Sequence, residues 1–259
     1  MYELKSFHCS YKFTLKLTIK SFNQSSFNGL FGFGMLQSAN TSYYIADYWN
    51  NRVYKLNNTW EYVGQNSFSN PSGIIAVSNN LYIASESQVY KTDSNLNVLN
   101  QYNNSINSPA YRGIFYNPTD CLIYIAAYND TVKAVHLFDL NLHLNGSIST
   151  SEYNPWSIVG FDNQIYIGTL QGVVIVIFNK TITTSFKGCL GISLISSILF
   201  DQLGYMAITC LNENRLYLYN SNGFYVGKSL ATGVFPLYTE FDSIGRFVLL
   251  SQNQISIFY

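Results

Sequence analysis

The sequence predicts an all-β protein built from repeats of about forty residues. Three observations support this fold class. A strand-like motif returns six times at a near-constant interval, similar shorter strands flank its copies, and no segment keeps helical periodicity over about ten residues. With 259 residues, the chain is long enough for one large all-β domain with a sizeable core.

The repeated motif is the stretch "YYIAD", which begins at Tyr43. The second residues of its six copies are Tyr44, Tyr82, Tyr124, Tyr166, Met206 and Val248. The intervals between them are 38, 42, 42, 40 and 42 residues. A repeat of this length made of short strands is typical of a β-propeller, so we expect a six-bladed propeller with one motif copy in each blade.

The strands around the motif follow a fixed order, which predicts four-stranded antiparallel blades. A shorter strand precedes the later five copies, at 72–77, 112–116, 156–161, 196–200 and 236–241. A third strand follows the motif, as at 172–178, and a more polar fourth strand comes last, as at 223–229. Propeller blades pack face to face, so their middle strands are covered on both sides. The repeats are therefore expected at about 27–66, 67–105, 106–150, 151–189, 190–230 and 231–259.

The sixth repeat stops at Tyr259, after its third strand. Residues 13–22 alternate between apolar and polar and precede the first inner strand by a normal distance. We therefore expect this N-terminal strand to complete the last blade, which removes an exposed edge and ties the two ends of the chain together. The single propeller domain would then cover 13–259, and 1–12 would form a loosely assigned N-terminal segment.

Charge is scarce in this chain and argues against some partners. Charged residues make up 11% of the sequence and the formal net charge is zero. Without a basic field, we expect no binding to nucleic acid. The most apolar short run, at 172–178, is too short to span a bilayer, so no membrane insertion is expected. Zero net charge also favours self-association.

Seven Asn-x-Ser/Thr sequons are candidate glycosylation sites. They are Asn23, Asn40, Asn57, Asn103, Asn129, Asn145 and Asn179. Composition alone predicts about five such sequons, so they favour an extracellular location only slightly. The N-terminus lacks the apolar run of a signal peptide, which leaves the compartment open.

No catalytic, metal or cofactor site is expected from the residue types that carry such chemistry. His8, His136 and His143 are placed away from a common point, and the cysteines lack the spacing of a zinc site. Cys121 and Cys210 lie in apolar runs, where buried free thiols are expected, although disulfide pairing among Cys9, Cys121, Cys189 and Cys210 stays open. No nucleophile elbow or phosphate-binding loop is present.

The stretch "YYIADYWNNRVYKL" at 43–56 resembles the signature of NHL-repeat propellers, whose units run as a Gly-Ile inner strand, then "LYVAD", then "NxRV". Repeat one carries the pattern in full at Asp47, Asn51 and Arg52, and repeat five keeps Asn214 and Arg215. The resemblance implies a toroid with an axial channel and a binding face made of inter-strand loops. Because the motif recurs, we expect these five residues to hold a hairpin corner between the second and third strands.

Aromatic residues and one arginine are expected together on the loops of one rim. The candidate partner-binding residues are Tyr48, Trp49, Tyr111, Arg112, Tyr128, Tyr153, Trp156 and Phe235. Such side chains are typical anchors at interfaces. The sequence thus favours a non-enzymatic scaffold that binds a protein or a glycan. Two alternatives stay open: a metal-dependent enzyme of the lactonase or lyase type at the channel mouth, and a structural subunit of a larger assembly.

Overall fold

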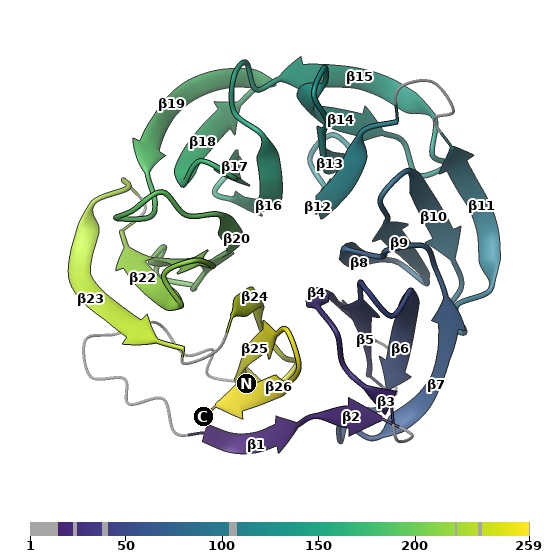
Figure 1. Ribbon diagram of the computed structural model, residues 1–259. Helices are drawn as coiled ribbons and strands as arrows, with labels where there is room; N and C mark the ends of the chain where they lie inside the picture. Colours follow the sequence, from purple (N-terminus) through teal and green to yellow (C-terminus); the bar gives the residue numbers. More distant parts are fainter. Residues whose placement is uncertain are drawn as a thin grey trace.

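Six four-stranded antiparallel sheets stand around a central axis in the computed structural model, as predicted (Figure 1). The structure describes residues 15–22, 25–37, 41–103, 108–220, 222–232 and 235–258. Within these residues every regular element is a β-strand. In the first five blades the strands follow chain order from the axis outwards.

The two strands nearest the axis carry the repeated motif and its upstream partner. The inner strands of blades one to six are β4 (Leu30–Leu36), β8 (Gly73–Val77), β12 (Ala110–Asn117), β16 (Pro155–Phe161), β20 (Ile195–Phe200) and β24 (Pro236–Phe241). The second strands, which contain the motif, are β5 (Ser42–Asp47), β9 (Asn80–Ala84), β13 (Leu122–Tyr128), β17 (Gln164–Thr169), β21 (Met206–Cys210) and β25 (Phe247–Ser251).

The two strands further from the axis complete each blade. The third strands are β6 (Arg52–Leu56), β10 (Gln88–Thr92), β14 (Lys133–Phe138), β18 (Val173–Phe178), β22 (Arg215–Tyr219) and β26 (Ile255–Phe258). The outer strands are β7 (Tyr62–Ser67), β11 (Val98–Asn103), β15 (Leu144–Ser149), β19 (Thr181–Lys187), β23 (Tyr225–Ala231) and, in the sixth blade, β1 (Leu15–Ile19).

An N-terminal strand closes the ring, as the sequence predicts. β1 pairs antiparallel with β26, so that Leu15 lies opposite Phe258 and Ile19 lies opposite Ile255. The predicted closing strand covers 13–22, whereas the pairing with β26 ends at Ile19, because β2 (Ser21–Phe22) pairs with β3 (Ser25–Ser26) instead. The Phe22 ring packs edge-on against the Tyr54 ring in the core. Residues 13 and 14, and the predicted segment 1–12 with His8, lie outside the described residues.

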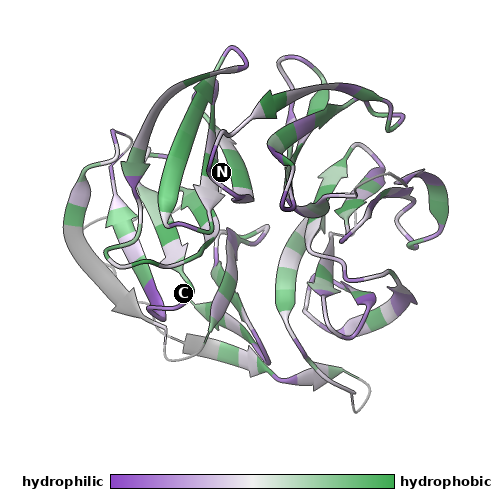
Figure 2. Ribbon diagram, turned by 45° about the horizontal axis from the view of Figure 1, so that its top comes forward, coloured by the Kyte–Doolittle hydropathy of each residue, from purple (hydrophilic) through white to green (hydrophobic). Residues whose placement is uncertain are grey.

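The core is divided among the interfaces between blades. Among the described residues, each of the six buried clusters joins a pair of neighbouring blades; the one that closes the ring combines Tyr43 and Ile45 of blade one with Val248 and Leu250 of blade six. Figure 2 shows hydrophobic residues along the strands and hydrophilic residues in the turns. Each blade is therefore stabilised by burial against both neighbours, which explains why the middle strands are apolar on both faces.

The cysteines differ from the expectation of buried free thiols. Cys210 is buried but forms a disulfide with Cys189, which lies in the loop after β19. Cys121 is free and exposed, because it ends the turn between β12 and β13 in a left-handed conformation with φ of 57°. The sequence could not show the pairing, since the two sulfurs meet only when blades four and five pack together. Cys9 lies outside the described residues.

No helix among the described residues is long and apolar enough to cross a membrane.

Candidate binding site at the mouth of the axial channel

Two kinds of loop meet at one end of the ring, which we call the front face. It is formed by the segments that lead into the inner strands and by the turns that join second to third strands. Antiparallel pairing brings these together, because the first residue of an inner strand lies opposite the last residue of its second strand, as Leu30 does with Asp47 and Pro155 with Thr169. The opposite end is the back face.

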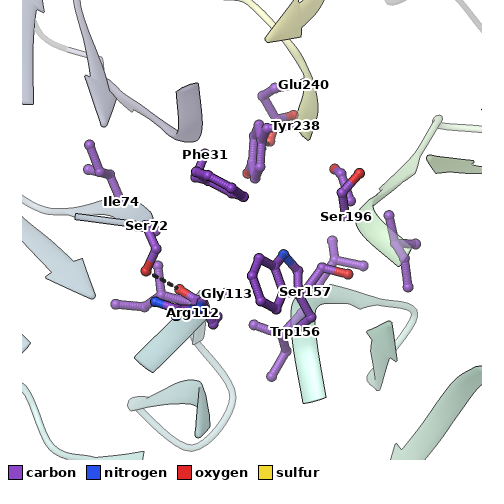
Figure 3. A pocket seen from close by; sticks show the side chains of 16 residues that line it. Phe31, Ser72, Ile74, Arg112, Gly113, Trp156, Ser157, Ser196, Tyr238 and Glu240 are labelled. Atoms are coloured by element: carbon purple, nitrogen blue, oxygen red, sulfur yellow. Dashed lines mark hydrogen bonds between the residues drawn. The ribbon is translucent and has the colours of Figure 1, made fainter. Parts of the chain in front are cut away.

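β-Bulges aim side chains into the channel at the front face. Five of the six inner strands shift register near their first residues, and three of these shifts fall at Phe31, Arg112 and Trp156. A bulge bends its strand and redirects a side chain. The side chains at these three positions therefore point to the axis, and do not simply alternate between the two faces of the blade. Figure 3 shows Phe31, Arg112 and Trp156 arranged around the channel.

These residues form a channel-mouth cluster, made of Phe31, Tyr48, Trp49, Arg112, Tyr128 and Trp156. The guanidinium carbon of Arg112 lies 5.0 Å from the ring centroid of Tyr48, 5.0 Å from that of Trp156 and 5.8 Å from that of Tyr128. A guanidinium at these distances is attracted by the ring quadrupoles. Burial raises the pKa of Tyr48, and the charge of Arg112 opposes that rise.

Phe31 completes the cluster from the first blade. Its ring centroid lies 5.1 Å from Tyr48, 5.4 Å from Trp49 and 5.8 Å from Trp156. Blades one and four stand on opposite sides of the ring (Figure 1), so the contact between Phe31 and Trp156 crosses the axis. The aromatic rings of the cluster therefore narrow the channel at the front face.

A small cavity of about 40 Å³ lies in the channel behind this cluster. All six inner strands or the residues leading into them line its wall, which includes Arg112, Trp156, Tyr238 and Glu240. The Tyr238 hydroxyl donates to a Glu240 carboxylate oxygen at 3.4 Å, and the Phe241 N–H donates to the other at 3.0 Å. Burial nevertheless dominates and raises the pKa of Glu240 to about 7.

Arg112 is a buried cation with few polar partners. Its side chain is 7% exposed, and its Nη1 donates a long hydrogen bond of 3.4 Å to the carbonyl oxygen of Tyr111. Its Nε is buried and has no hydrogen-bond partner among the described residues. No described carboxylate lies within the 4.0 Å of an ion pair. A buried charge in this state is costly, and the three aromatic rings are what compensates for it.

Close packing of the inner strands fixes the backbone under the cluster. Gly113 lets β12 approach β16 closely, since a Cβ atom there would lie 2.8 Å from the carbonyl oxygen of Trp156. The hydroxyl of Ser72 donates to the carbonyl oxygen of Tyr111 at 2.8 Å. These contacts hold Arg112 and Trp156 at fixed positions around the axis.

The predicted turn residues lie at the front face beside the cluster. Asp47 is fully buried and accepts hydrogen bonds from the Asn28 N–H at 3.0 Å and the Asn50 side chain at 2.8 Å. Burial raises its pKa despite these bonds. The Arg52 Nε donates to the Asn50 carbonyl oxygen at 3.2 Å.

The two asparagines of the turn motif share one backbone conformation. Asn51 and Asn214 occupy equivalent left-handed positions, with φ of 54° and 50°. The side-chain oxygen of Asn51 accepts the Asn70 N–H at 2.8 Å. Arg215 pairs with Cys210 across the equivalent corner of blade five.

Five of the eight predicted partner-binding residues meet in the channel-mouth cluster. Tyr111 is corrected, because it is fully buried between blades two and three, where its hydroxyl meets His136 Nδ1 at 3.3 Å. Tyr153 is half-buried against the core of blades three and four, and Phe235 is exposed just before β24. Phe31 was not predicted from the sequence. A glycine follows both Phe31 and Arg112 at the bulges, and a glycine within a strand is the sequence signal that could have indicated this position.

The candidate glycosylation sites differ in their surroundings. Asn103, Asn145 and Asn179 are exposed. Asn57 and Asn129 are half-buried, and their side-chain oxygens accept backbone N–H groups within turns. Asn23 and Asn40 lie outside the described residues.

Among the residues that the structure describes, the titratable groups that bind metals do not converge in the channel. Among the described residues, Cys189, Cys210 and Glu213 come closest to a donor set, but the disulfide occupies both sulfurs. His143 lies in the turn between β14 and β15, where its Nδ1 is 2.9 Å from a carboxylate oxygen of Asp139.

Comparisons with known proteins identify the class of protein, and the class alone. A WD40 β-propeller domain of Doa1 superposes with a TM-score of 0.68 at 9% sequence identity, covering 89% of this chain and 78% of that one. The chain is therefore a six-bladed β-propeller. No family model and no curated protein matches it. The likeness of its first repeat to the NHL signature thus stays a resemblance.

Proposed function

We propose that this propeller is a non-enzymatic binding scaffold that holds a protein partner on its front face. The observation that carries the proposal is the exposure of Trp49 on the channel-mouth cluster, with further large hydrophobic side chains exposed on loops of the same face. Trp49 is 48% exposed, Phe235 51%, Leu190 59% and Ile192 91%. Large hydrophobic side chains such as Leu203 and Phe224 are exposed on the back face too, but on the front face Trp49 lies on a packed aromatic cluster, which is typical of an interaction surface.

Trp49 has the properties of an anchor for such a partner. Its indole packs on Gly29, where an added Cβ would collide with the ring, and meets Phe31 and Tyr48 edge-on. An aromatic side chain that is already held in place loses little conformational entropy on binding. Leu190 and Ile192, exposed on another loop of the front face, favour a protein partner, because they add apolar area without hydrogen-bonding groups for a sugar.

The enzymatic alternative has less support from the channel. Among the residues that line its cavity, Glu240 is the one carboxylate, and none is a histidine or cysteine. A catalytic metal needs several such side chains to converge on one point.

A glycan is the second candidate ligand, at a different place. A surface cavity of about 590 Å³ on the back face combines the exposed ring of Phe178 with Asn117, Asn163, Asp120 and Lys180. A cavity of this size with one apolar surface and several polar groups suits a small polar ligand. Binding to a glycan array that Phe178→Ala abolishes would support this candidate.

The test of the main proposal compares the two faces. Trp49→Ala and Ile192→Ser change the front face, while Leu203→Ser and Phe224→Ser change equally exposed positions on turns of the back face. We expect quantitative affinity capture from a native extract to lose a partner at least about tenfold with the front-face variants and to keep it with the back-face variants. Capture that survives the front-face changes would contradict the proposal. Light scattering of the wild type tests the self-association alternative.

A further inference from the structure

We propose that the channel cavity binds a small carboxylate through the guanidinium of Arg112. The inference goes beyond the proposed function, because it requires no protein partner and concerns the interior of the channel rather than the exposed face. Its starting point is a cation that the fold buries without an anion beside it.

The described protein groups do not neutralise Arg112. Its side chain is 7% exposed, no described carboxylate lies within ion-pair distance, and its buried Nε has no partner. Aromatic rings attract the charge, and the Tyr48 side chain also forms a hydrogen bond with Arg112, but neither brings the negative charge of an anion. A buried hydrogen-bond donor without an acceptor is costly, so an acceptor in the cavity would stabilise the fold.

Two acidic residues, Glu240 and Glu86, are candidates for the counter-ion of Arg112, and neither is paired with it. Glu240 lines the same cavity from the sixth blade, which stands opposite the third blade that carries Arg112 (Figure 1). The causes that shift the pKa of Glu240 are burial and its bonds to Phe241 and Tyr238, with no contribution from Arg112. Glu86 is exposed on the front face and is not paired with Arg112.

The serine hydroxyls around the cavity leave Arg112 as the donor for a ligand. The hydroxyls of Ser72, Ser157 and Ser196 line the cavity, and each donates to a backbone carbonyl of the next blade, at 2.8, 3.1 and 2.7 Å. Their protons are therefore used within the inner wall. The edge of the guanidinium presents N–H groups in the spacing that two carboxylate oxygens accept.

The size of the cavity selects among anions. One water needs about 10–15 Å³ of such volume, so about 40 Å³ holds roughly three water-sized atoms. A carboxylate group has three heavy atoms and one negative charge. Phosphate and sulfate have five heavy atoms and would bring a second charge into a channel that also contains Glu240.

Formate is the probe for the test, because it consists of a carboxylate group with only a hydrogen atom attached. Thermal unfolding of the wild-type protein is measured in sodium formate and in sodium chloride at equal ionic strength. Tryptophan fluorescence is titrated with formate in parallel, because the ring centroid of Trp156 lies 5.0 Å from the guanidinium carbon of Arg112. With formate at about a hundred times its Kd, we expect the melting temperature to rise by about 5 °C over chloride. No formate-specific rise and no fluorescence change in the wild type would overturn the proposal.

Two arginine substitutions separate the site from general salt effects. Arg112→Lys keeps the charge but loses the two-pronged edge, so we expect the Kd for formate to rise at least about tenfold. Arg52→Lys makes the same change at a front-face arginine that does not line the cavity, and its formate response should match the wild type. An unchanged response in Arg112→Lys would overturn the assignment to Arg112. Because the wild type is read directly, the test does not depend on the folding of a variant.

A carboxylate has two sources, a free acid or an acidic side chain of a partner. A peptide with blocked ends and a single Asp is added to the formate complex, with the Asn peptide as its control. Displacement of formate by the Asp peptide alone assigns the site to a side chain; formate binding without displacement assigns it to a free acid. These outcomes are read without the front-face partner, so this inference and the proposed function can fail independently.

Discussion

Phe31 of the first blade and Trp156 of the fourth blade meet across the propeller axis, with ring centroids 5.8 Å apart. Each lies at a bulge near the start of its inner strand. The contact links opposite sides of the ring, which neighbouring-blade packing alone does not do. It also places two rings between solvent at the front face and the cavity that contains Arg112.

Removing this contact should open the channel and weaken the fold. Phe31→Ala loses ring contacts to Tyr48, Trp49 and Trp156, and we expect it to lower the free energy of unfolding by about 3 kcal/mol. Acrylamide should quench tryptophan fluorescence more strongly in the variant. Phe224→Ala, at an exposed phenylalanine, is the control and should change stability by less than about 0.5 kcal/mol. Equal effects of the two would contradict this role of Phe31.

Glu240 should make stability fall as the pH rises. Its pKa is raised from 4.5 to about 7 by burial, so the folded state binds a proton between these values that the unfolded state has released. Its contribution is therefore fully present below pH 4.5 and is lost as the pH rises through about 7, by roughly 3 kcal/mol. The measurement is urea unfolding of wild type and Glu240→Gln from pH 4.5 to 8.

The difference between the two proteins isolates this carboxyl from other titrating groups. Burial lowers the pKa of His136, which acts in the opposite direction because a buried neutral imidazole destabilises the fold as the pH falls below its ordinary value. That effect is common to both proteins and cancels. The glutamine variant should gain on the wild type as the pH rises; parallel curves would show that the pKa of Glu240 is the same in the folded and unfolded states.

Asp47 should matter more to stability than its partner in the turn motif. It is buried and accepts hydrogen bonds from Asn28 and Asn50, so Asp47→Ala leaves these donors without their acceptor and should cost about 3 kcal/mol. Arg52→Ala removes one longer bond to a backbone oxygen and should cost about 1 kcal/mol. Urea unfolding measures both values. Arg52→Ala should also retain partner capture, and loss of capture with unchanged stability would make the turn a binding site.

The blades were predictable because their signal is local and periodic. The copies of the motif around Tyr44 and Tyr82 each alternate as strands do, and their spacing needs no tertiary information. The binding site was predictable only in part, because it depends on the register between strands. The shift between Tyr111 and Ile114 turns Arg112 to the channel and leaves Tyr111 in the core. One residue of register exchanges the two faces of a strand, and a sequence taken alone does not contain it.

The disulfide should account for a measurable part of the stability of blades four and five. Cys189 and Cys210 are separated by 21 residues, and a cross-link of this length restricts the unfolded chain by about 3 kcal/mol. We expect the double change of Cys189→Ser and Cys210→Ser to lower the free energy of unfolding by that order. Cys121→Ser, at an exposed free thiol, should change it little. Peptide mapping should find Cys121 alkylated in the native protein and the other two only after reduction; the reverse labelling would contradict the pairing.

The last prediction concerns the strand that closes the ring. β1 supplies the outer strand of the sixth blade, so its removal leaves the hydrogen-bonding edge of β26 uncovered from Ile255 to Phe258. It also removes Phe22, whose ring packs in the cluster between blades six and one. We therefore expect a chain without residues 1–22 to aggregate or to unfold without a cooperative transition.

A milder variant and a control separate the effect of strand pairing from the effect of deleting the whole segment 1–22. Thr18→Pro stays within β1 but removes one backbone donor opposite Ser256, and it should lower the unfolding midpoint in urea markedly. Thr18→Val keeps the pairing and should lie close to the wild type, because the β-branched residue suits a strand. If the truncated chain instead unfolds cooperatively at the wild-type midpoint, the ring is held by its other five blade interfaces, and β1 only covers an edge.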